Sequence, residues 1–525
     1  MLQSLKSTVS RNARTILFGL SVAFIALLDP FGLASSSSAA SARWLNRLLA
    51  QDYPDKGQDQ VVVILLDDAY LQRHQTYWPL PYSEQGKLFK RLFAYQPGAV
   101  FVDLLYSHDH SRAVSGQPAQ MESQLLANVF DRYQRKGITL LLANSGSALD
   151  TPGAVNVLPR FASVSRPALV SWNGFGDQYP LSVQTPLGAL ESPALGLYRE
   201  YCRRHYCPGL PVDAEAAAQQ PAMTVQWGLK LSPRQQLISR IEDCSAPGVL
   251  WQMLQAMFWK LGNSAQATCP YSLTLSASDL EATSEKDREL LGRLLRGKLV
   301  LVGASIAGTG DLTLSPLHGK LPGVYLHAMA LDNLIVQGQH YYRDPPVLPL
   351  LPGSLNWVDL LQLLMLGVIA ALNAIQERPA DSWPRQRWLR SPFLGLALTT
   401  ALLILVSYAL YWLNMTPVNV LGILLLSLSL FTERIREFLQ PRPRKAFENC
   451  LKGAQRCTRH PFSCAAPCSA RACSLPTWWW GTSKTRWSFS TTRAKSSVKC
   501  LSPTCRSKRC QCCNTTRKPT RCRSK

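Results

Sequence analysis

The stretch RGKLVLVGASIAGTGDLTLSPLHGKLPGVYLHAMALDN, residues 296–333, decides the predicted fold. It predicts a buried strand over residues 298–302, because a short leucine- and valine-rich run that ends in glycine is typical of a parallel sheet. The glycines that follow predict a tight turn, and the Pro322-Gly323 pair predicts a second turn. A helix is expected from Val324, with His327 on its first turns beside that loop.

Three further apolar runs predict buried strands, over residues 61–66, 99–104 and 138–143. Helix-forming sequence separates them, and Ser83 is expected to cap one of these helices. Strands that alternate with helices favour an α/β fold with a largely parallel sheet. The serine- and alanine-rich residues 35–41, which precede the first strand, are expected to form a flexible linker.

Acidic residues stand at the ends of two predicted strands. Because the carboxyl ends of parallel strands share the edge at which open α/β sheets bind ligands, these residues are candidate ligand contacts. Asp67, Asp68 and Asp103 are expected either to bind a cation or a cationic ligand, or to cap helices and accept hydrogen bonds from the backbone. The full set of residues expected to contact a ligand is Asp67, Asp68, Trp78, Asp103, Gly303, Ser305, Asp311 and His327.

His327 has a second interpretation, as a structural histidine held by hydrogen bonds.

We expect neither a metal nor a cofactor, because no close paired spacing of ligands supports a metal site. The nucleophile-elbow pattern G-x-S-x-G fails at Ala307, and the P-loop pattern fails because Thr309 stands where a lysine is required. With no nucleophile–base pair in the predicted domain, we do not expect an enzyme.

Four apolar segments predict membrane helices. Residues 15–34 follow a basic N-terminus over 1–14 and can form an anchor if the apolar run continues past Asp29. The alternative is a signal peptide that is cleaved at the A-x-A pattern of Ala40-Ser41-Ala42. The other three segments are residues 355–375, 392–413 and 418–432.

Charges in the loops set the predicted orientation. Residues 376–391 carry four arginines and the stalk over 433–449 is also basic, whereas the hairpin over 414–417 carries no charge. By the positive-inside rule, the N-terminus and both basic segments are cytoplasmic. Residues 35–350 must then lie outside, which in a Gram-negative cell is the periplasm.

The cysteines divide between the body of the chain and its end. Of the 15 cysteines, 11 lie at or after Cys450, and the other four can pair in three ways. A periplasmic location permits disulfides. The local pairs Cys202–Cys207 and Cys244–Cys269 are then the first candidates, and small buried thiols are the alternative.

Motifs at both ends of the predicted outer domain resemble the CHASE2 family, which comprises extracytoplasmic sensor domains of bacterial membrane receptors. At the C-terminal end the matching elements are Gly297-Lys298, a hydrophobic run into VGAS, Gly310-Asp311, Pro316-Leu317, PGV and His327. At the N-terminal end they are VVVILLDD, Trp78-Pro79, QPGAV and FVDLLYS, whereas residues 150–285 match less clearly. The resemblance implies a sensor whose relatives usually carry a cyclase, a diguanylate cyclase or a kinase after the last membrane helix.

The C-terminal residues 450–525 hold 17 of the chain's 56 Lys and Arg residues and no Asp or Glu, so much of the formal charge of +23 lies there. Three interpretations compete: a metal-binding cysteine tail, a basic tail that binds nucleic acid or anionic lipid, and a shifted reading frame that has replaced an effector domain. We favour the shifted frame, and we expect the tail to be disordered and not to bind nucleic acid.

The sequence therefore predicts a multi-pass inner-membrane receptor, with an α/β extracytoplasmic sensor domain, α-helical membrane segments and a disordered basic tail. It is expected to bind an unknown extracytoplasmic ligand, to form a homodimer, and to pass the signal through its membrane helices to a separate cytoplasmic effector. One alternative is a receptor enzyme (class III adenylate or guanylate cyclase, diguanylate cyclase or kinase) that has lost its catalytic domain. The other alternative is a structural envelope protein.

Overall fold

The computed structural model describes residues 33–50, 52–109, 111, 119–146, 156–172, 178–186, 188–207, 209–238, 271–308, 311–346, 356–376 and 392–439. The chain divides into two compact units, Met1–Pro441 and Arg442–Lys525. All described residues belong to the first unit. The predicted tail over 450–525 and all but the last two residues of the predicted anchor over 15–34 therefore lie outside the described residues.

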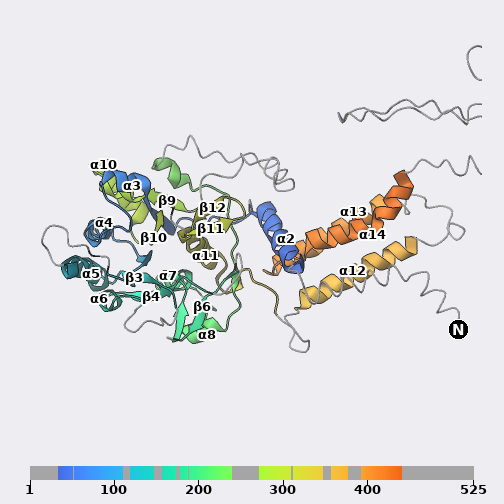
Figure 1. Ribbon diagram of the computed structural model, residues 1–525, viewed down its shortest axis with the longest axis horizontal. Helices are drawn as coiled ribbons and strands as arrows, with labels where there is room; N and C mark the ends of the chain where they lie inside the picture. The colour runs from blue at the N-terminus through green and yellow to red at the C-terminus, as the bar shows by residue number, and fades with distance from the viewer. Residues whose placement is uncertain are drawn as a thin grey trace, which may run out of the picture. The chain divides into compact units, whose positions relative to one another are not determined.

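A six-stranded parallel sheet forms the centre of the domain and confirms the predicted α/β class (Figure 1). The last long strand in the sequence lies in the middle of the sheet, where strands are buried on both faces and are therefore apolar throughout. In spatial order the strands are β4 (Arg166–Leu169), β3 (Thr139–Asn144), β2 (Ala99–Leu105), β10 (Leu299–Ser305), β1 (Val61–Asp67) and β9 (Leu273–Ser276).

Helices cover both faces of this sheet, because alternate residues of each strand point to opposite sides. In β1, Val62 and Ile64 pack into one hydrophobic core and Val61 and Val63 into the other. The first core is covered by α3 (Asp68–Arg73), α4 (Tyr82–Ala94), α5 (Ala119–Arg135) and α10 (Glu285–Leu295), and the second by α7 (Pro193–Cys202) and α11 (Val324–Gln337).

Short elements surround the sheet, and the sequence analysis did not predict them. They include the strand pairs β5 (Gln178–Tyr179) with β8 (Met223–Thr224), β6 (Ser182–Thr185) with β7 (Gly188–Glu191), and β11 (Leu312–Ser315) with β12 (Gly319–Pro322). The short helices are α6 (Pro159–Ala162), α8 (Ala214–Ala218), and the 3₁₀ helices η1 (Pro233–Leu237), η4 (Ala277–Glu281) and η5 (Gly338–His340).

The prediction of a flexible linker over 35–41 is wrong, because these residues belong to helix α2 (Leu33–Leu49). Serines favour loops when their hydroxyls compete for backbone hydrogen bonds. Here the buried Ser41 hydroxyl donates to the carbonyl of Ser37 at 2.8 Å and accepts from the backbone N–H of Leu421 at 3.0 Å. The serines of α2 therefore hold this helix against a segment that is distant in sequence.

Two local predictions within the domain are also corrected. The glycine-rich turn was predicted to begin at Gly303, but β10 continues to Ser305, and the positive φ of 86° is found at Gly308. Ser83 was predicted to cap a helix, but α4 begins one residue earlier, at Tyr82, with Pro81 at the N-cap position. The proline favours this start because its fixed φ suits the beginning of a helix.

A disulfide joins Cys202 at the end of α7 to Cys207 in the loop that follows, with their Cα atoms 5.4 Å apart. This is one of the two local pairs expected from the sequence. The other pair, Cys244 and Cys269, lies outside the described residues.

Three long helices follow the domain: α12 (Trp357–Gln376), α13 (Pro392–Trp412) and α14 (Val420–Leu439). Within the part of the chain that the structure describes, only Phe393–Trp412 is both long and apolar enough to cross a membrane. The apolar parts of the other two helices, Trp357–Ile369 and Val420–Ser429, are shorter. The structure therefore supports one of the membrane helices predicted from the sequence and leaves the rest as predictions.

Candidate functional site

The predicted ligand edge lies at the carboxyl ends of three neighbouring strands, β2, β10 and β1. The register pairs Val102 with Val302 and Asp67 with Ser305, so Asp103 stands beside Gly303 at the same end of the sheet. Because side chains alternate along a strand, Asp103 and Ser305 point to the face that α11 covers, whereas the carboxylate of Asp67 turns to α3. The sequence thus placed these residues at one edge, and the structure adds that Asp103 and Ser305 share one face.

Gly303 lets α11 approach this edge. A Cβ atom at this position would lie 2.5 Å from the Cβ of Val324, the first residue of α11. Such a contact is too short for any side chain, so only glycine permits this close packing of helix and strand. The close approach brings His327, the fourth residue of α11, to the end of β2.

A buried histidine and a buried aspartate meet there. The Nε2 atom of His327 lies 3.9 Å from an Oδ atom of Asp103, and the two side chains are only 6% and 10% exposed. On its other side, the Nδ1 atom of His327 shares a hydrogen bond of 2.8 Å with the Tyr179 hydroxyl. The rings of Phe101 and Trp172 lie edge-on to the imidazole. His327 is therefore held by Tyr179, while its Nε2 atom faces Asp103 without a hydrogen bond to it.

Burial changes the proton affinity of both groups. It raises the pKa of Asp103 to about 8, with a further contribution from the nearby charge of Asp311, and it lowers the pKa of His327 to about 3. Both shifts have the sign expected when a low-dielectric site disfavours the charged form. At neutral pH the pair is therefore uncharged, and Asp103 carries a proton that it can donate.

Asp67 and Asp68 make the contacts of the alternative structural interpretation. The carboxylate of Asp67 accepts a hydrogen bond of 2.7 Å from the backbone N–H of Tyr70 and so caps α3. The carboxylate of the exposed Asp68 accepts from the backbone N–H of Ala307 at 3.1 Å and ties α3 to the loop after β10. Both residues lie at the edge, and both have a structural role there.

Asp311 lies on the side of the sheet that carries Asp103 and His327, whereas Trp78 lies on the other side. The exposed Asp311 lies against Gly323, whose backbone N–H donates to the Asp311 carbonyl at 3.2 Å. The carboxylate of Asp311 therefore lies at the N-terminus of α11. A negative charge is favourable at that end of a helix. Trp78, which follows α3 and precedes a cis proline, packs instead into the core on the opposite face of the sheet. The structure therefore does not bring Trp78 together with His327.

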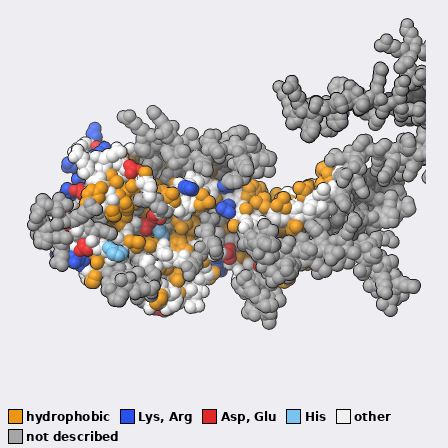
Figure 2. Space-filling view, in the orientation of Figure 1, with side chains coloured by type: hydrophobic (Ala, Val, Ile, Leu, Met, Phe, Trp, Pro, Cys, Tyr) orange, Lys and Arg blue, Asp and Glu red, His pale blue; other side chains and the backbone are white. Residues whose placement is uncertain are grey.

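Figure 2 shows acidic and histidine side chains among hydrophobic ones in the region where β10 and α11 lie in Figure 1. Within the described residues, no group of three or more His, Cys, Asp or Glu side chains could hold a metal ion. The arrangement can instead bind a polar ligand through hydrogen bonds, because it offers an imidazole nitrogen, a carboxyl group and nearby carboxylates.

The sequence analysis missed a second buried polar group, on the C-terminal half of α11. Asp332 and Asn333 are fully buried, and the Tyr53 hydroxyl donates to Asp332 at 2.7 Å. Burial raises the pKa of Asp332 to about 7. Two adjacent polar residues within an otherwise apolar helix were a signal of this site in the sequence, because buried polar groups are rare without partners.

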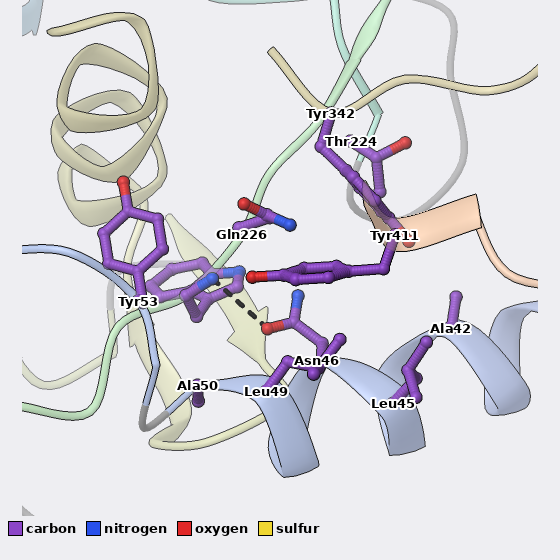
Figure 3. A pocket seen from close by; sticks show the side chains of 11 residues that line it. Ala42, Leu45, Asn46, Leu49, Ala50, Tyr53, Thr224, Gln226, Tyr342 and Tyr411 are labelled. Carbon is purple, nitrogen blue, oxygen red and sulfur yellow. Dashed lines mark hydrogen bonds between the residues drawn. The ribbon is translucent and has the colours of Figure 1, made fainter. Parts of the chain in front are cut away.

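A small cavity lies close to that group (Figure 3). Its volume is about 20 Å³, which is enough for one water molecule. It is lined by α2, by the segment that carries Gln226 and Trp227, and by Tyr53, Tyr342 and Tyr411. The indole N–H of Trp227 is buried there without a hydrogen-bond partner within the described part of the chain.

Comparison with known families agrees with the motifs at the strand ends. The CHASE2 domain family matches residues 19–369, which is about two thirds of the chain. The chain belongs to the CHASE2 family. CHASE2 domains are extracellular sensory domains, so the α/β domain is sensory in type. No curated protein and no solved structure matches this CHASE2 chain.

Proposed function

We propose that this CHASE2 protein is an inner-membrane receptor that binds a ligand in the periplasm and passes the signal inward through its membrane helices. Membership of a sensory family supports the first part. Helix α13 supports attachment to a membrane, because Phe393–Trp412 is long enough to cross the hydrocarbon core. In this proposal the chain has no enzymatic activity of its own and acts on a separate cytoplasmic effector.

The buried pair of Asp103 and His327 is the observation that carries the ligand site. A gap of 3.9 Å between the two groups leaves neither hydrogen-bonded to the other, and the two side chains are only 6% and 10% exposed. A ligand N–H or O–H donor at this point would satisfy the Asp103 carboxyl, and it would satisfy Nε2 of His327 in the tautomer that donates from Nδ1 to Tyr179. The pair lies at the edge where open α/β sheets bind ligands.

The charge of the edge supports a positively charged ligand. Asp67 and Asp68 stand at the junction of β1 and α3, Asp103 lies near the end of β2, and Asp311 directly precedes β11. Within the described residues none of them forms an ion pair with Lys or Arg. The carboxylates of Asp67, Asp68 and Asp311 attract cations and repel anions, and a bound cation would also favour ionisation of Asp103. We therefore propose a small organic cation, with an ammonium group directed at Asp103 and His327.

The helices after the domain support a multi-pass arrangement. The loop between α13 and α14 is hydrogen-bonded to the domain, because the N–H of Arg343 donates to Asn414 and the N–H of Thr416 donates to Arg343, both at 3.1 Å. A loop bonded to a periplasmic domain is itself periplasmic, so a spanning α13 begins in the cytoplasm. The chain must then cross the membrane between the domain and α13, which we assign to α12.

We also propose a homodimer. On α12, Leu360, Leu364 and Val368 are exposed and are spaced four residues apart, so they form one apolar stripe. Such a stripe faces either lipid or the same helix of a second copy. A helix interface between two copies would let a movement of α12 in one copy change the arrangement of both.

The ligand proposal is tested by thermal unfolding of the full chain in detergent, with putrescine as the probe and succinate as a dianionic control. Putrescine is expected to raise the unfolding temperature and succinate is not, because the edge carries only acidic groups. The variant Asp311→Asn should reduce the shift, while Asp287→Asn, at the start of α10, should leave it unchanged. Equal shifts with both compounds, or no shift with putrescine, would contradict a cationic ligand.

A further inference from the structure

Helix α11 joins two buried polar groups that lie about 9 Å apart along its axis. Its N-terminal half carries His327, which faces Asp103 at the ligand edge. Its C-terminal half carries Asp332 and Asn333, which lie on the side of the domain that faces α2. A rigid helix transfers a displacement at one end to the other, so the contacts of Asn333 decide where a movement at the edge would go.

Asn333 has a partner for each of its polar atoms. Its amide nitrogen donates to the Tyr53 hydroxyl at 2.8 Å and to the carbonyl of Gln226 at 2.9 Å, and its amide oxygen accepts from the N–H of Gln226 at 2.8 Å. Tyr53 in turn donates to Asp332. The amide of Asn333 is fully hydrogen-bonded, although one carboxylate oxygen of Asp332 is buried without a partner among the described residues. A buried amide bonded in this way holds its neighbours rigidly. It fixes α11 to two segments, one after α2 and one that contains Gln226.

The first of these segments leads to α14 through α2. Tyr53 follows α2 closely, and Asn46 of α2 donates to the carbonyl of Val225 at 3.2 Å. Farther back along α2, the Ser41 hydroxyl donates to the side chain of Asn419 at 3.1 Å, just before α14 begins. Helix α2 is therefore bonded to the network at one end and to the start of α14 at the other.

The second segment leads to the loop between α13 and α14. Met223 pairs with Arg343 as an antiparallel bridge, and Arg343 pairs with Met415 as a parallel bridge. The N–H of Thr224 also donates to the carbonyl of Tyr342 at 2.7 Å. A strip of backbone hydrogen bonds thus runs from the segment of Gln226 through residues 342–343 to residues 414–416.

The small cavity lies between these two connections. In Figure 3, the phenol of Tyr411, from the last turn of α13, reaches toward Asn46 of α2 and toward Gln226. A cavity of about 20 Å³ lies at this point, beside the buried indole of Trp227, so side chains do not fill the space between the two connections. Incomplete packing leaves room for α2 and the end of α13 to shift relative to the network.

We propose that α11 and its Asn333–Tyr53–Gln226 network form the element that couples the ligand edge to the membrane helices, through α2 on one side and Arg343 on the other. This inference rests on the proposed receptor function and assigns its route. Ligand contact at His327 displaces α11, the network carries the displacement to both connections, and the hairpin of α13 and α14 follows. A coupling of this kind requires a physically connected element that both sites bias.

Hydrogen exchange measured by mass spectrometry on the full chain in detergent tests the route without any ligand. Asp311→Lys places a positive charge at the N-terminus of α11, where it opposes the helix dipole, and the exposed position tolerates the change. We expect exchange in peptides that cover residues 342–343 and 414–416 to become about twofold to fivefold faster, the effect of such a charge on local opening. Asp287→Lys makes the same change at the N-terminus of α10, off the route, and should leave these peptides unchanged.

The network is tested by combining the edge change with Asn333→Leu, which keeps a side chain of similar size but removes the bonds to both Tyr53 and Gln226. In this background Asp311→Lys should no longer change exchange at residues 342–343 and 414–416. The matched control is Gln235→Ala, another buried amide that bonds the backbone, at Thr274. Transmission that persists in Asn333→Leu, or that Gln235→Ala abolishes equally, would overturn the assignment. A failed ligand search would leave the result intact, because no ligand is used.

Discussion

At the residue scale, Asp103 gives the ligand edge a dependence on pH. Its pKa is raised to about 8, whereas His327 stays neutral because its pKa is lowered to about 3. A cation favours the ionised carboxylate, so below pH 8 binding must release the proton of Asp103. The affinity for putrescine should therefore rise between pH 6 and pH 8, by up to about tenfold per unit. Calorimetry across this range measures it.

Asp103→Asn is the matched variant for this prediction, because asparagine copies the shape of the protonated acid and cannot ionise. Its binding of putrescine should be weak and nearly independent of pH. A wild-type affinity that is flat from pH 6 to pH 8 would show that Asp103 does not contact the bound cation.

Asp332 makes a separate prediction about stability. Its pKa in the folded chain is raised to about 7 by burial, from an ordinary value of 3.8. Between these two values the folded state binds more protons than the unfolded state, so the free energy of unfolding falls as pH rises from about 4 to 7. Groups that face it are Tyr53, Tyr271 and, more distantly, Asp55, and among the described residues no Lys or Arg pairs with it.

Asp332→Asn removes this charge, and we expect it to stabilise the chain at pH 8 by about 1–3 kcal/mol, with little effect at pH 4. Urea unfolding at the two pH values measures the difference. The free energy of unfolding of this variant should still depend partly on pH, because the pKa of Asp103 is also raised in the folded chain. Asp287→Asn, an exposed change, is the control, and a variant that is no more stable than wild type at pH 8 would contradict the prediction.

The residues at the edge were predictable because their position follows from neighbouring residues in the sequence alone. An acidic residue directly after a buried strand, such as Asp67 or Asp103, lies at the carboxyl edge of a parallel sheet whatever the rest of the fold. Tyr179 was not predictable, because it meets His327 across 148 residues of sequence. The role of Asp332 was hidden for the same reason, since its partner Tyr53 comes from the opposite end of the domain.

At the element scale, the contact between β10 and α11 depends on one missing side chain. Gly303→Ala would place a Cβ atom 2.5 Å from that of Val324, so helix and strand would have to separate. Overpacking of this kind costs about 1–3 kcal/mol. The variant should lower the free energy of unfolding by that amount, measured in urea, and should weaken putrescine binding because it moves His327.

Gly292→Ala is the control for Gly303, because it lies in α10 and an added Cβ there meets nothing within 4 Å. That change should stabilise the chain by up to about 1 kcal/mol, since alanine is the better helix former. If the two glycine variants had equal effects, close packing at Gly303 would not explain its presence.

A helix or strand was predictable from the sequence when its burial is visible in its own residues. The central strands β1, β2, β3 and β10 are buried on both faces and read as continuous apolar runs. The edge strands β4 and β9 are short and mixed, so no local signal marks them. Helix α2 was mistaken for a linker because its serines are satisfied by Asn419 and Leu421, almost 400 residues away.

At the scale of the whole molecule, the number of membrane crossings decides how the domain can signal. Length and apolarity support only α13 among the described helices. Two arrangements follow for a periplasmic domain. If α13 alone follows the domain across the membrane, residues 377–391 are periplasmic and the loop after α13 is cytoplasmic. If α12, α13 and α14 all cross, residues 377–391 are cytoplasmic and the loop after α13 is periplasmic.

The hydrogen bonds of Arg343 favour the second arrangement. Arg343 follows the last helices of the domain and bonds Asn414 and Thr416, so the loop after α13 belongs on the periplasmic side with it. The four arginines of 376–391 then lie in the cytoplasm, as the positive-inside rule requires.

A reporter enzyme that is active only in the periplasm should therefore be inactive when fused after residue 391 and active when fused after Met415. Replacing the four arginines with glutamine should weaken this difference, because the charge that holds the loop inside is lost. Activity after residue 391 together with inactivity after Met415 would leave α13 as the sole crossing, and the route through Arg343 would then have no membrane hairpin to move.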